Sequence, residues 1–195
     1  MSSQDNVNNE ETINLVKKFI ASNQRKRRNL VNDIESSAES LYIVGEEIIN
    51  NVDREGDDWC IGWVLQVLKK YKPNFFDKDI YNNWYYTKSG INLNYDNLQL
   101  NLLKQNFEEA DRLTSAYLRK LAGKVAENRG YVFYSEVKDM PDEDLVTIDR
   151  LWNIYSQGKF GFSNQAKLLK SVGKRYDLLW PKIGWKKDGV WTRYP

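Results

Sequence analysis

Residues 141–158 read PDEDLVTIDRLWNIYSQG, and they carry a clear helical pattern. Pro141 and the acidic turn that follows it are typical of a helix start, because acidic side chains favour the positive end of the helix dipole. Apolar residues then recur at helical spacing: Leu145, Ile148, Leu151, Trp152 and Tyr155. Gly158 is a typical residue just past a helix end. The stretch therefore predicts an amphipathic helix with one face in the core.

Outward from this stretch, the same spacing recurs in both directions. Amphipathic runs are found near 98–103, 107–121 and 164–172, and earlier in the chain over 30–49 and 59–71. No strand pattern alternates cleanly for more than four residues, so the predicted fold class is all-α. We expect three parts: a mostly disordered leader over 1–22 with a short helix from Glu10 to Ile20, an N-terminal helical bundle and linker over 23–90, and a compact helical domain over 91–195.

Composition excludes several classes of enzyme and carrier. The 195 residues include no histidine and a single cysteine, Cys60, which rules out histidine-dependent catalysis, imidazole-ligated zinc and an internal disulfide. The net charge of +2 gives no overall field that would favour nucleic acid. No pair of carboxylates stands out as a catalytic acid and base. We expect no catalytic residues, no metal ligands and no bound cofactor.

Four local features have a structural and a functional interpretation. The basic cluster over 25–28 is compatible with phosphate or a membrane surface, but a solvated helix face is the favoured interpretation. Asp149 is expected to cap a neighbouring backbone rather than to act in catalysis. Cys60 is expected to be a packed thiol, and Trp152 a core residue rather than a ligand contact.

The last third of the chain is dense in aromatic side chains with basic residues between them. About half of these rings are needed to build a core, and the remainder can line a concave surface with a cationic rim. Such a surface suits a large flat apolar ligand with carboxylates at one edge. It equally suits the stacked bases of a single-stranded nucleic acid, and composition alone does not separate the two.

The residues themselves carry a more specific signal. Several strings resemble the genomes-uncoupled-four family over about half the chain: residues 144–152, 155–165, 107–111 with Thr114, 133–137, 180–185 and 190–195. The last of these, VWTRYP, resembles cyanobacterial members closely, and residues 30–70 more weakly resemble the helical bundle that precedes the domain in cyanobacterial and algal members.

The resemblance implies an all-α domain shaped like a cupped hand, with an apolar palm that binds porphyrins. Its implied ligands are protoporphyrin IX and Mg-protoporphyrin IX, and its implied role is a non-catalytic activator of magnesium chelatase, with the large porphyrin-binding subunit as partner. A tetrapyrrole-sensing interaction module that does not act on the chelatase is the alternative. The resemblance implies no nucleic-acid partner and is compatible with peripheral association with a membrane.

Positions that match the family's palm or its entrance are the expected porphyrin contacts: Val125, Phe133, Tyr134, Val137, Phe160, Phe162, Trp191, Arg193 and Tyr194. Phe160 and Phe162 are equally compatible with support of the helix junction, and Arg193 with a surface ion pair to Asp188. Family members continue past the last string through a loop and a final helix. We expect the 91–195 domain to lack these, because the sequence stops at Pro195.

The expected compartment follows from composition. Residues 1–11 carry Asp5, Glu10 and Glu11 and no basic side chain, unlike a transit peptide. The chain is also rich in Asn, as in AT-rich genomes. We therefore expect a plastid-encoded protein of the chloroplast stroma, with a cyanobacterial cytoplasm as the alternative.

Overall fold

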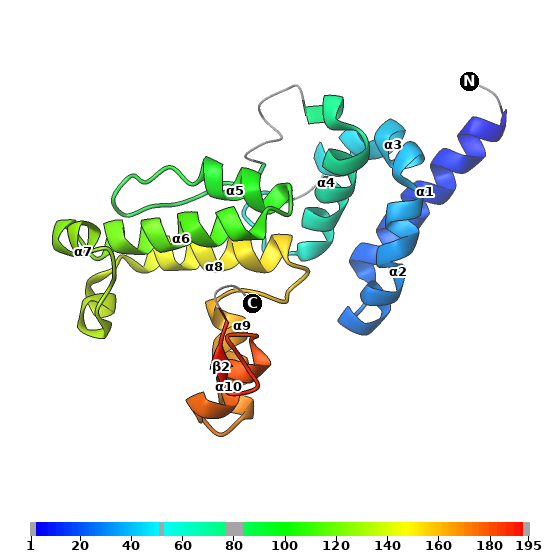
Figure 1. Cartoon of the computed structure of the whole chain (residues 1–195). Helices are drawn as coiled ribbons and strands as arrows, with labels where there is room; N and C mark the ends of the chain where they lie inside the picture. Colours follow the sequence, from blue (N-terminus) through cyan, green and yellow to red (C-terminus); the bar gives the residue numbers. More distant parts are fainter. Residues whose placement is uncertain (1–2, 51–52, 77–83, 193–195) are drawn as a thin grey trace.

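The computed structural model describes residues 3–50, 53–76 and 84–192, and these are predominantly α-helical (Figure 1). The prediction of an all-α protein is confirmed, with a single small two-stranded hairpin among the described residues. The N-terminal helices are α1 (Ser3–Ala21), α2 (Gln24–Ser36), α3 (Ala38–Asn50) and α4 (Trp59–Tyr71), followed by the 3-10 turn η1 (Pro73–Phe76).

Two features of this N-terminal part differ from expectation. Most of the expected disordered leader is helix α1, in which Val16 and Phe19 are buried in the core, so apolar burial offsets the cost of ordering it. The run over 30–49 is two helices rather than one, because the chain turns at Ser37. Asn23 starts α2 by accepting a hydrogen bond from the Lys26 backbone N–H at 3.1 Å.

The second half contains α5 (Asp96–Leu103), α6 (Phe107–Leu121), α7 (Lys124–Arg129), the 3-10 helix η3 (Tyr134–Asp139) and α8 (Asp142–Tyr155). After it come α9 (Phe162–Ser171), α10 (Tyr176–Lys182) and the hairpin strands β1 (Lys186–Lys187) and β2 (Val190–Trp191). Asp188 and Gly189 turn the hairpin with φ of +51° and +83°, a pair of positive values typical of a tight hairpin turn.

Helix α4 lies between α1–α3 and the layer formed by α5, α6 and α8 (Figure 1). Every residue from Trp59 to Leu68 is buried, so α4 is buried on all sides rather than on one face, and Gln66 is the polar side chain of this stretch. Gly62 permits the close approach to α8, since a Cβ there would lie 2.6 Å from Ile154 Cγ2 and 2.7 Å from its carbonyl oxygen. One continuous core therefore joins buried residues from Val16 to Tyr155.

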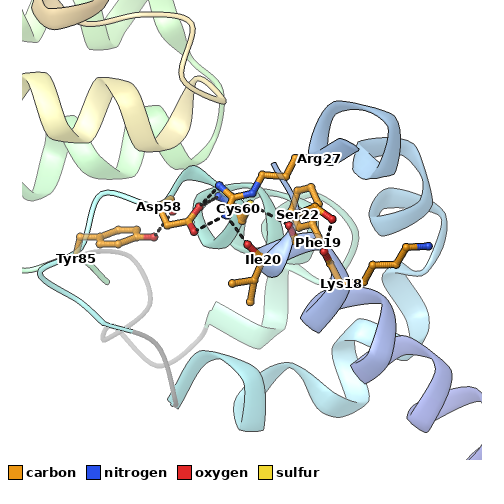
Figure 2. Close-up of polar contacts among 8 residues, drawn as sticks. All are labelled: Lys18, Phe19, Ile20, Ser22, Arg27, Asp58, Cys60 and Tyr85. Carbon is orange, nitrogen blue, oxygen red and sulfur yellow. Dashed lines mark hydrogen bonds and ion pairs between the residues drawn. The ribbon is translucent and has the colours of Figure 1, made fainter. Parts of the chain in front are cut away.

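The junction of α1 and α2 is tied to the start of α4 through Arg27 (Figure 2). The Arg27 guanidinium donates to both carboxylate oxygens of Asp58 at 3.1 Å and to the Ile20 carbonyl. Asp58 also caps α4 by accepting from the Cys60 backbone N–H at 2.9 Å. In the basic cluster, Arg27 is therefore ion-paired and half-buried, whereas Arg25, Lys26 and Arg28 are exposed, largely as expected.

The segment before α5 is fastened to α5 and α8 by buried amide and carboxylate groups. The Gln99 side chain accepts from the Tyr85 N–H at 2.7 Å and donates to the Tyr85 carbonyl at 3.0 Å. Asp144 is fully buried, accepting from the Tyr95 hydroxyl at 2.6 Å and the Gly90 N–H at 2.8 Å. These pairings fix α8, the helix predicted most clearly from sequence, against the core.

Candidate functional site

An open apolar groove of about 570 Å³ lies where α6, η3, α8 and the start of α9 meet. The residues that line it are mostly aliphatic or aromatic: Leu118, Val132, Phe133, Tyr134, Val137, Met140, Leu145, Val146, Asp149 and Phe162. Its volume falls within the roughly 300–1,000 Å³ typical of small-molecule sites. We refer to these residues as the groove.

The wall formed by η3 is held in place by Arg129, the last residue of α7. Its guanidinium lies 4.0 Å from the centre of the Phe133 ring and 4.7 Å from that of Tyr131. It also donates to Glu136 at 2.6 Å, and the same Glu136 oxygen accepts from the Phe133 N–H at 2.7 Å. The Phe133 N–H and Arg129 together lower the pKa of Glu136, because both stabilise its charged form.

The floor of the groove comes from one face of α8, and the wall above it includes a free aromatic ring. Leu145, Val146 and Asp149 follow one another at positions i, i+1 and i+4, which places them on adjoining parts of the helix surface. Tyr134 is 95% exposed, so its ring is free to meet a ligand. Met140, in contrast, is buried at 6% exposure and closes the junction of η3 with α8.

Phe162 enters the groove at the start of α9, whose position depends on Asp149. Gly161 precedes this helix with a φ of +117°, and it has no side chain to cap the helix. The Asp149 carboxylate instead accepts from the Ser163 N–H at 3.0 Å. The expectation that Asp149 caps a neighbouring backbone is therefore confirmed, and the cap fixes the end of α9 that carries Phe162.

Four of the predicted contact residues lie together in the groove: Phe133, Tyr134, Val137 and Phe162. Phe160, two residues before Phe162, packs instead between Phe107 and Trp152, at ring-centre distances of 5.7 and 6.0 Å. These contacts fit its interpretation as a support of the helix junction, and 47% of the residue remains exposed. Trp152 is 9% exposed, as expected for a core residue.

The remaining predicted contacts lie elsewhere. Val125 is 72% exposed on α7 and does not line the groove, because α7 begins after a turn at Gly123. The ring of Trp191 on β2 packs on that of Trp180 on α10, with 4.7 Å between the ring centres. Trp191 also lies outside the groove. Arg193 and Tyr194 lie outside the residues that the structure describes.

Sequence reasoning did not assign several groove residues to the site: Leu118, Val132, Met140, Leu145, Val146 and Asp149. Leu118 and Leu145 have the same apolar spacing as their buried neighbours, so the sequence predicts that they lie on the core face. Val146 is 63% exposed and adjoins that face, and an apolar residue beside a core stripe is a weak signal of a binding surface.

A second hollow, of about 640 Å³, lies along the outer face of α6 and is polar. Its lining includes Glu109 and Arg112, which form an ion pair with each other, and Arg119, which donates to Ser115 at 2.8 Å. Burial raises the pKa of Asp111 there. Because its lining residues are all polar or charged and none is aromatic, this hollow does not match a flat apolar ligand.

Within the described ranges, no group of three or more acidic or cysteine side chains is placed to hold a metal ion. Among the same residues, none of the helices is both long and apolar enough to cross a membrane. Cys60 is buried beside Phe19, and burial raises the pKa of its thiol, as fits a packed side chain. The groove is thus the feature of the described residues best suited to a flat apolar ligand.

These features define an all-α protein with an open groove of aromatic and aliphatic side chains on its second half. Residues 88–195 match the model of the family described as GUN4-like. The chain belongs to the GUN4-like family.

Known relatives come from cyanobacterial, red-algal and plant sources. A Ycf53-like protein of Synechocystis is 37% identical over 157 residues, which cover 78% of this chain and 67% of the relative. The uncharacterized protein ycf53 of Porphyra purpurea is 42% identical, with 55% and 45% covered. A protein named tetrapyrrole-binding protein, chloroplastic, from Arabidopsis thaliana is 43% identical, with 48% and 35% covered. The chain thus spans less than half the length of the last two.

Among solved structures, that of GUN4 from Chlamydomonas reinhardtii is similar to this chain with a TM-score of 0.51 and 35% sequence identity. The match covers 53% of this chain and 73% of that one. The likeness therefore extends over a little more than half of the chain.

Proposed function

We propose that this protein binds protoporphyrin IX and Mg-protoporphyrin IX in the groove and, as a non-catalytic regulator, stimulates magnesium chelatase. The observation that carries the proposal is the groove itself, with Phe133, Tyr134 and Phe162 placed around an aliphatic floor. Membership of the GUN4-like family and the name of the Arabidopsis relative support the same ligand class. The relatives' sources fit a chloroplast stroma or a cyanobacterial cytoplasm.

The physics of the groove suits a ligand that is held and then released. A porphyrin offers two broad apolar faces, and burying a few hundred Å² of them yields on the order of 10 kcal/mol before association costs. A ligand that is held and then released needs a net affinity near micromolar, and we propose that value here. The open side leaves the propionates at the edge of the groove, where a cation is needed, and Arg193 remains the proposed partner for them.

Tryptophan fluorescence tests porphyrin binding directly, since the chain has seven Trp residues, Trp152 among them on the groove-forming helix α8. We expect saturable quenching by protoporphyrin IX at micromolar concentrations and none by a small indole analogue.

Val146→Asp places a charge on the exposed floor and should weaken binding at least tenfold. Val7→Asp on α1, at another exposed valine, is the matched control and should bind as the wild type does. Unchanged emission at tens of micromolar porphyrin would overturn the proposal.

An assay with purified magnesium chelatase subunits tests the regulatory half of the proposal. The wild-type protein should raise the rate of magnesium insertion, and Val146→Asp should not, while Val7→Asp should act as the wild type. Saturable porphyrin binding with no effect on the chelatase would instead favour the tetrapyrrole-sensing module.

A further inference from the structure

The wall of the groove formed by η3 is not held in place by burial in the core. Phe133, Tyr134 and Val137 line the groove from this side, yet every residue of η3 is exposed or half-buried. The nearest buried side chains along the chain are Ala126 on α7 and Met140 just after η3. Because burial of apolar surface is the main force that orders a segment, the position of this wall depends on its polar and ring contacts.

These contacts converge on Arg129, the last residue of α7, which does not itself line the groove. Its guanidinium donates to the Tyr131 carbonyl at 2.9 Å and to Glu136 Oε2 at 2.6 Å. The same Glu136 oxygen accepts from the Phe133 N–H at 2.7 Å. The centre of the Phe133 ring lies 4.0 Å from the guanidinium carbon, a cation–π distance. Arg129 therefore fixes both the backbone and the ring of Phe133.

The Arg129–Glu136 ion pair is shielded from water more than the other ion pair of α7. The side chains of Arg129 and Glu136 are 19% and 23% exposed, against 80% and 36% for Lys124 and Glu127. Water screens exposed ion pairs, so they contribute little. A shielded pair with a charge-assisted hydrogen bond is stronger. The Arg129–Glu136 pair is thus suited to hold a wall that has no buried side chain, and Lys124 offers a matched control.

We propose that Arg129 is a positioning residue for porphyrin binding: through Phe133 and Glu136 it holds η3 in the binding-competent position before a ligand arrives. This inference rests on the proposed function, since it assigns to the same groove a residue that acts through the ligand contacts. If the wall is competent for only a fraction of the time, the apparent affinity falls by that fraction. Loss of Arg129 should then slow association, while the contacts in the complex, and so its dissociation rate, stay the same.

Stopped-flow quenching of Trp emission by protoporphyrin IX measures both rate constants. We expect Arg129→Gln to lower the association rate constant at least fivefold, as for a wall that is competent at most a fifth of the time, and to leave the dissociation rate constant within twofold of the wild type. Arg129→Lys keeps the charge but not the planar fork, so it should recover only part of the loss. Tyr134→Ala removes a ligand contact and keeps the ion pair, so it should instead raise the dissociation rate constant.

Two variants separate positioning from the attraction of an anionic ligand by positive charge. Lys124→Gln also removes one positive charge from α7 and should associate at the wild-type rate. Glu136→Ala removes a negative charge, which by electrostatic steering alone would speed the approach of the propionates. Positioning requires the opposite, an association at least fivefold slower. Equal slowing by Arg129→Gln and Lys124→Gln, or faster association of Glu136→Ala, would overturn the inference.

The two members of the pair should also act as one unit. The double variant Arg129→Gln with Glu136→Ala should associate about as slowly as the slower of the two single variants, because either change alone breaks the pair. Multiplied effects of the two changes would mean that Arg129 and Glu136 act separately, and would overturn the inference.

A measurement without ligand tests the placement of the wall itself. Amide exchange by NMR at Phe133, whose N–H donates to Glu136, should be at least fivefold faster in Arg129→Gln and unchanged in Lys124→Gln. A Phe133 amide that exchanges at the wild-type rate, or an unchanged association rate in an Arg129→Gln variant with the wild-type circular dichroism spectrum, would overturn the inference and leave the proposed function standing. A wild-type protein that binds no porphyrin would overturn the proposed function itself.

Discussion

At the scale of single residues, Asp149 and Gly161 restrict each other. Gly161 has φ of +117° and ψ of 160°, a backbone conformation that is essentially confined to glycine. Its missing side chain also leaves space for the Asp149 carboxylate that caps α9. The identity of one residue therefore depends on the other, across the junction that places Phe162 in the groove.

We expect Gly161→Ala to lower the free energy of unfolding by about 2–4 kcal/mol. Backbone strain accounts for ~1–3 kcal/mol, and displacement of the overlapping carboxylate adds to it. Urea denaturation followed by circular dichroism measures the change. Gly123→Ala is the matched control, because Gly123 has φ of +98° and ψ of 173° but no atom within 4 Å of its would-be Cβ. That variant should cost only the backbone strain, ~1–3 kcal/mol, and equal losses in the two variants would contradict the role of the carboxylate contact.

At the scale of elements, the approach of α4 to α8 depends on Gly62. In an open helix, Gly→Ala is stabilising by about 0.5–1 kcal/mol. Here we expect Gly62→Ala to destabilise the protein by about 1–3 kcal/mol, because the added methyl group overlaps Ile154. The sign of the change in urea denaturation is the test, and stabilisation would show that the two helices separate easily.

A second variant locates the source of that overlap. Ile154→Ala removes the side-chain contact but leaves the Ile154 carbonyl oxygen 2.7 Å from the new Cβ. Adding Gly62→Ala to Ile154→Ala should therefore still destabilise the protein.

The stability of the 3-10 helix η3 should depend on pH through the charge of Glu136. Its pKa is lowered in the folded protein by the Phe133 N–H and by Arg129. Because the pKa of Glu136 is lower in the folded protein, its ionised carboxylate stabilises the folded state. This stabilisation is fully present above the pKa of the unfolded chain, about 4.3, and is lost as pH falls through the pKa of the folded protein. A carboxyl-carbon NMR titration should show Glu136 protonating at a lower pH than an ordinary glutamate does. Titration of Glu136 at or above the ordinary glutamate value would contradict this account.

At the scale of the whole molecule, the continuous core ends at α8, and α9, α10 and the hairpin extend away from it (Figure 1). Among residues 162–192, Leu179 alone is buried. Few buried apolar contacts mean a low free energy for local opening.

Hydrogen exchange followed by mass spectrometry should therefore show two classes of backbone amide, one slow and one fast. Amides of α4 and α8 should share the slowest exchange, set by global unfolding, and those of α9 and α10 should exchange markedly faster. Saturating porphyrin should slow exchange at the start of α9, where Phe162 meets the groove. If amides of α8 and α10 exchanged equally slowly without ligand, local opening of α9, α10 and the hairpin would not be easier than global unfolding.

The all-α class, α8 as a helix, the buried Trp152 and the packed Cys60 followed from sequence alone. Each depends on spacing along a single helix or on the chemistry of a few neighbouring residues, and both are local properties. The sequence strings that resemble the GUN4-like family also predicted four ligand contacts that lie together in the groove: Phe133, Tyr134, Val137 and Phe162.

Tertiary structure decided the rest, because spacing shows which residues share a face but not what covers that face. Phe160 and Phe162 are two residues apart, yet one ring packs on Trp152 and the other lines the groove. Val146 lines the groove only because η3 lies across from it. Asp149 caps α9 only because the tertiary structure places the Ser163 N–H 3.0 Å from its carboxylate.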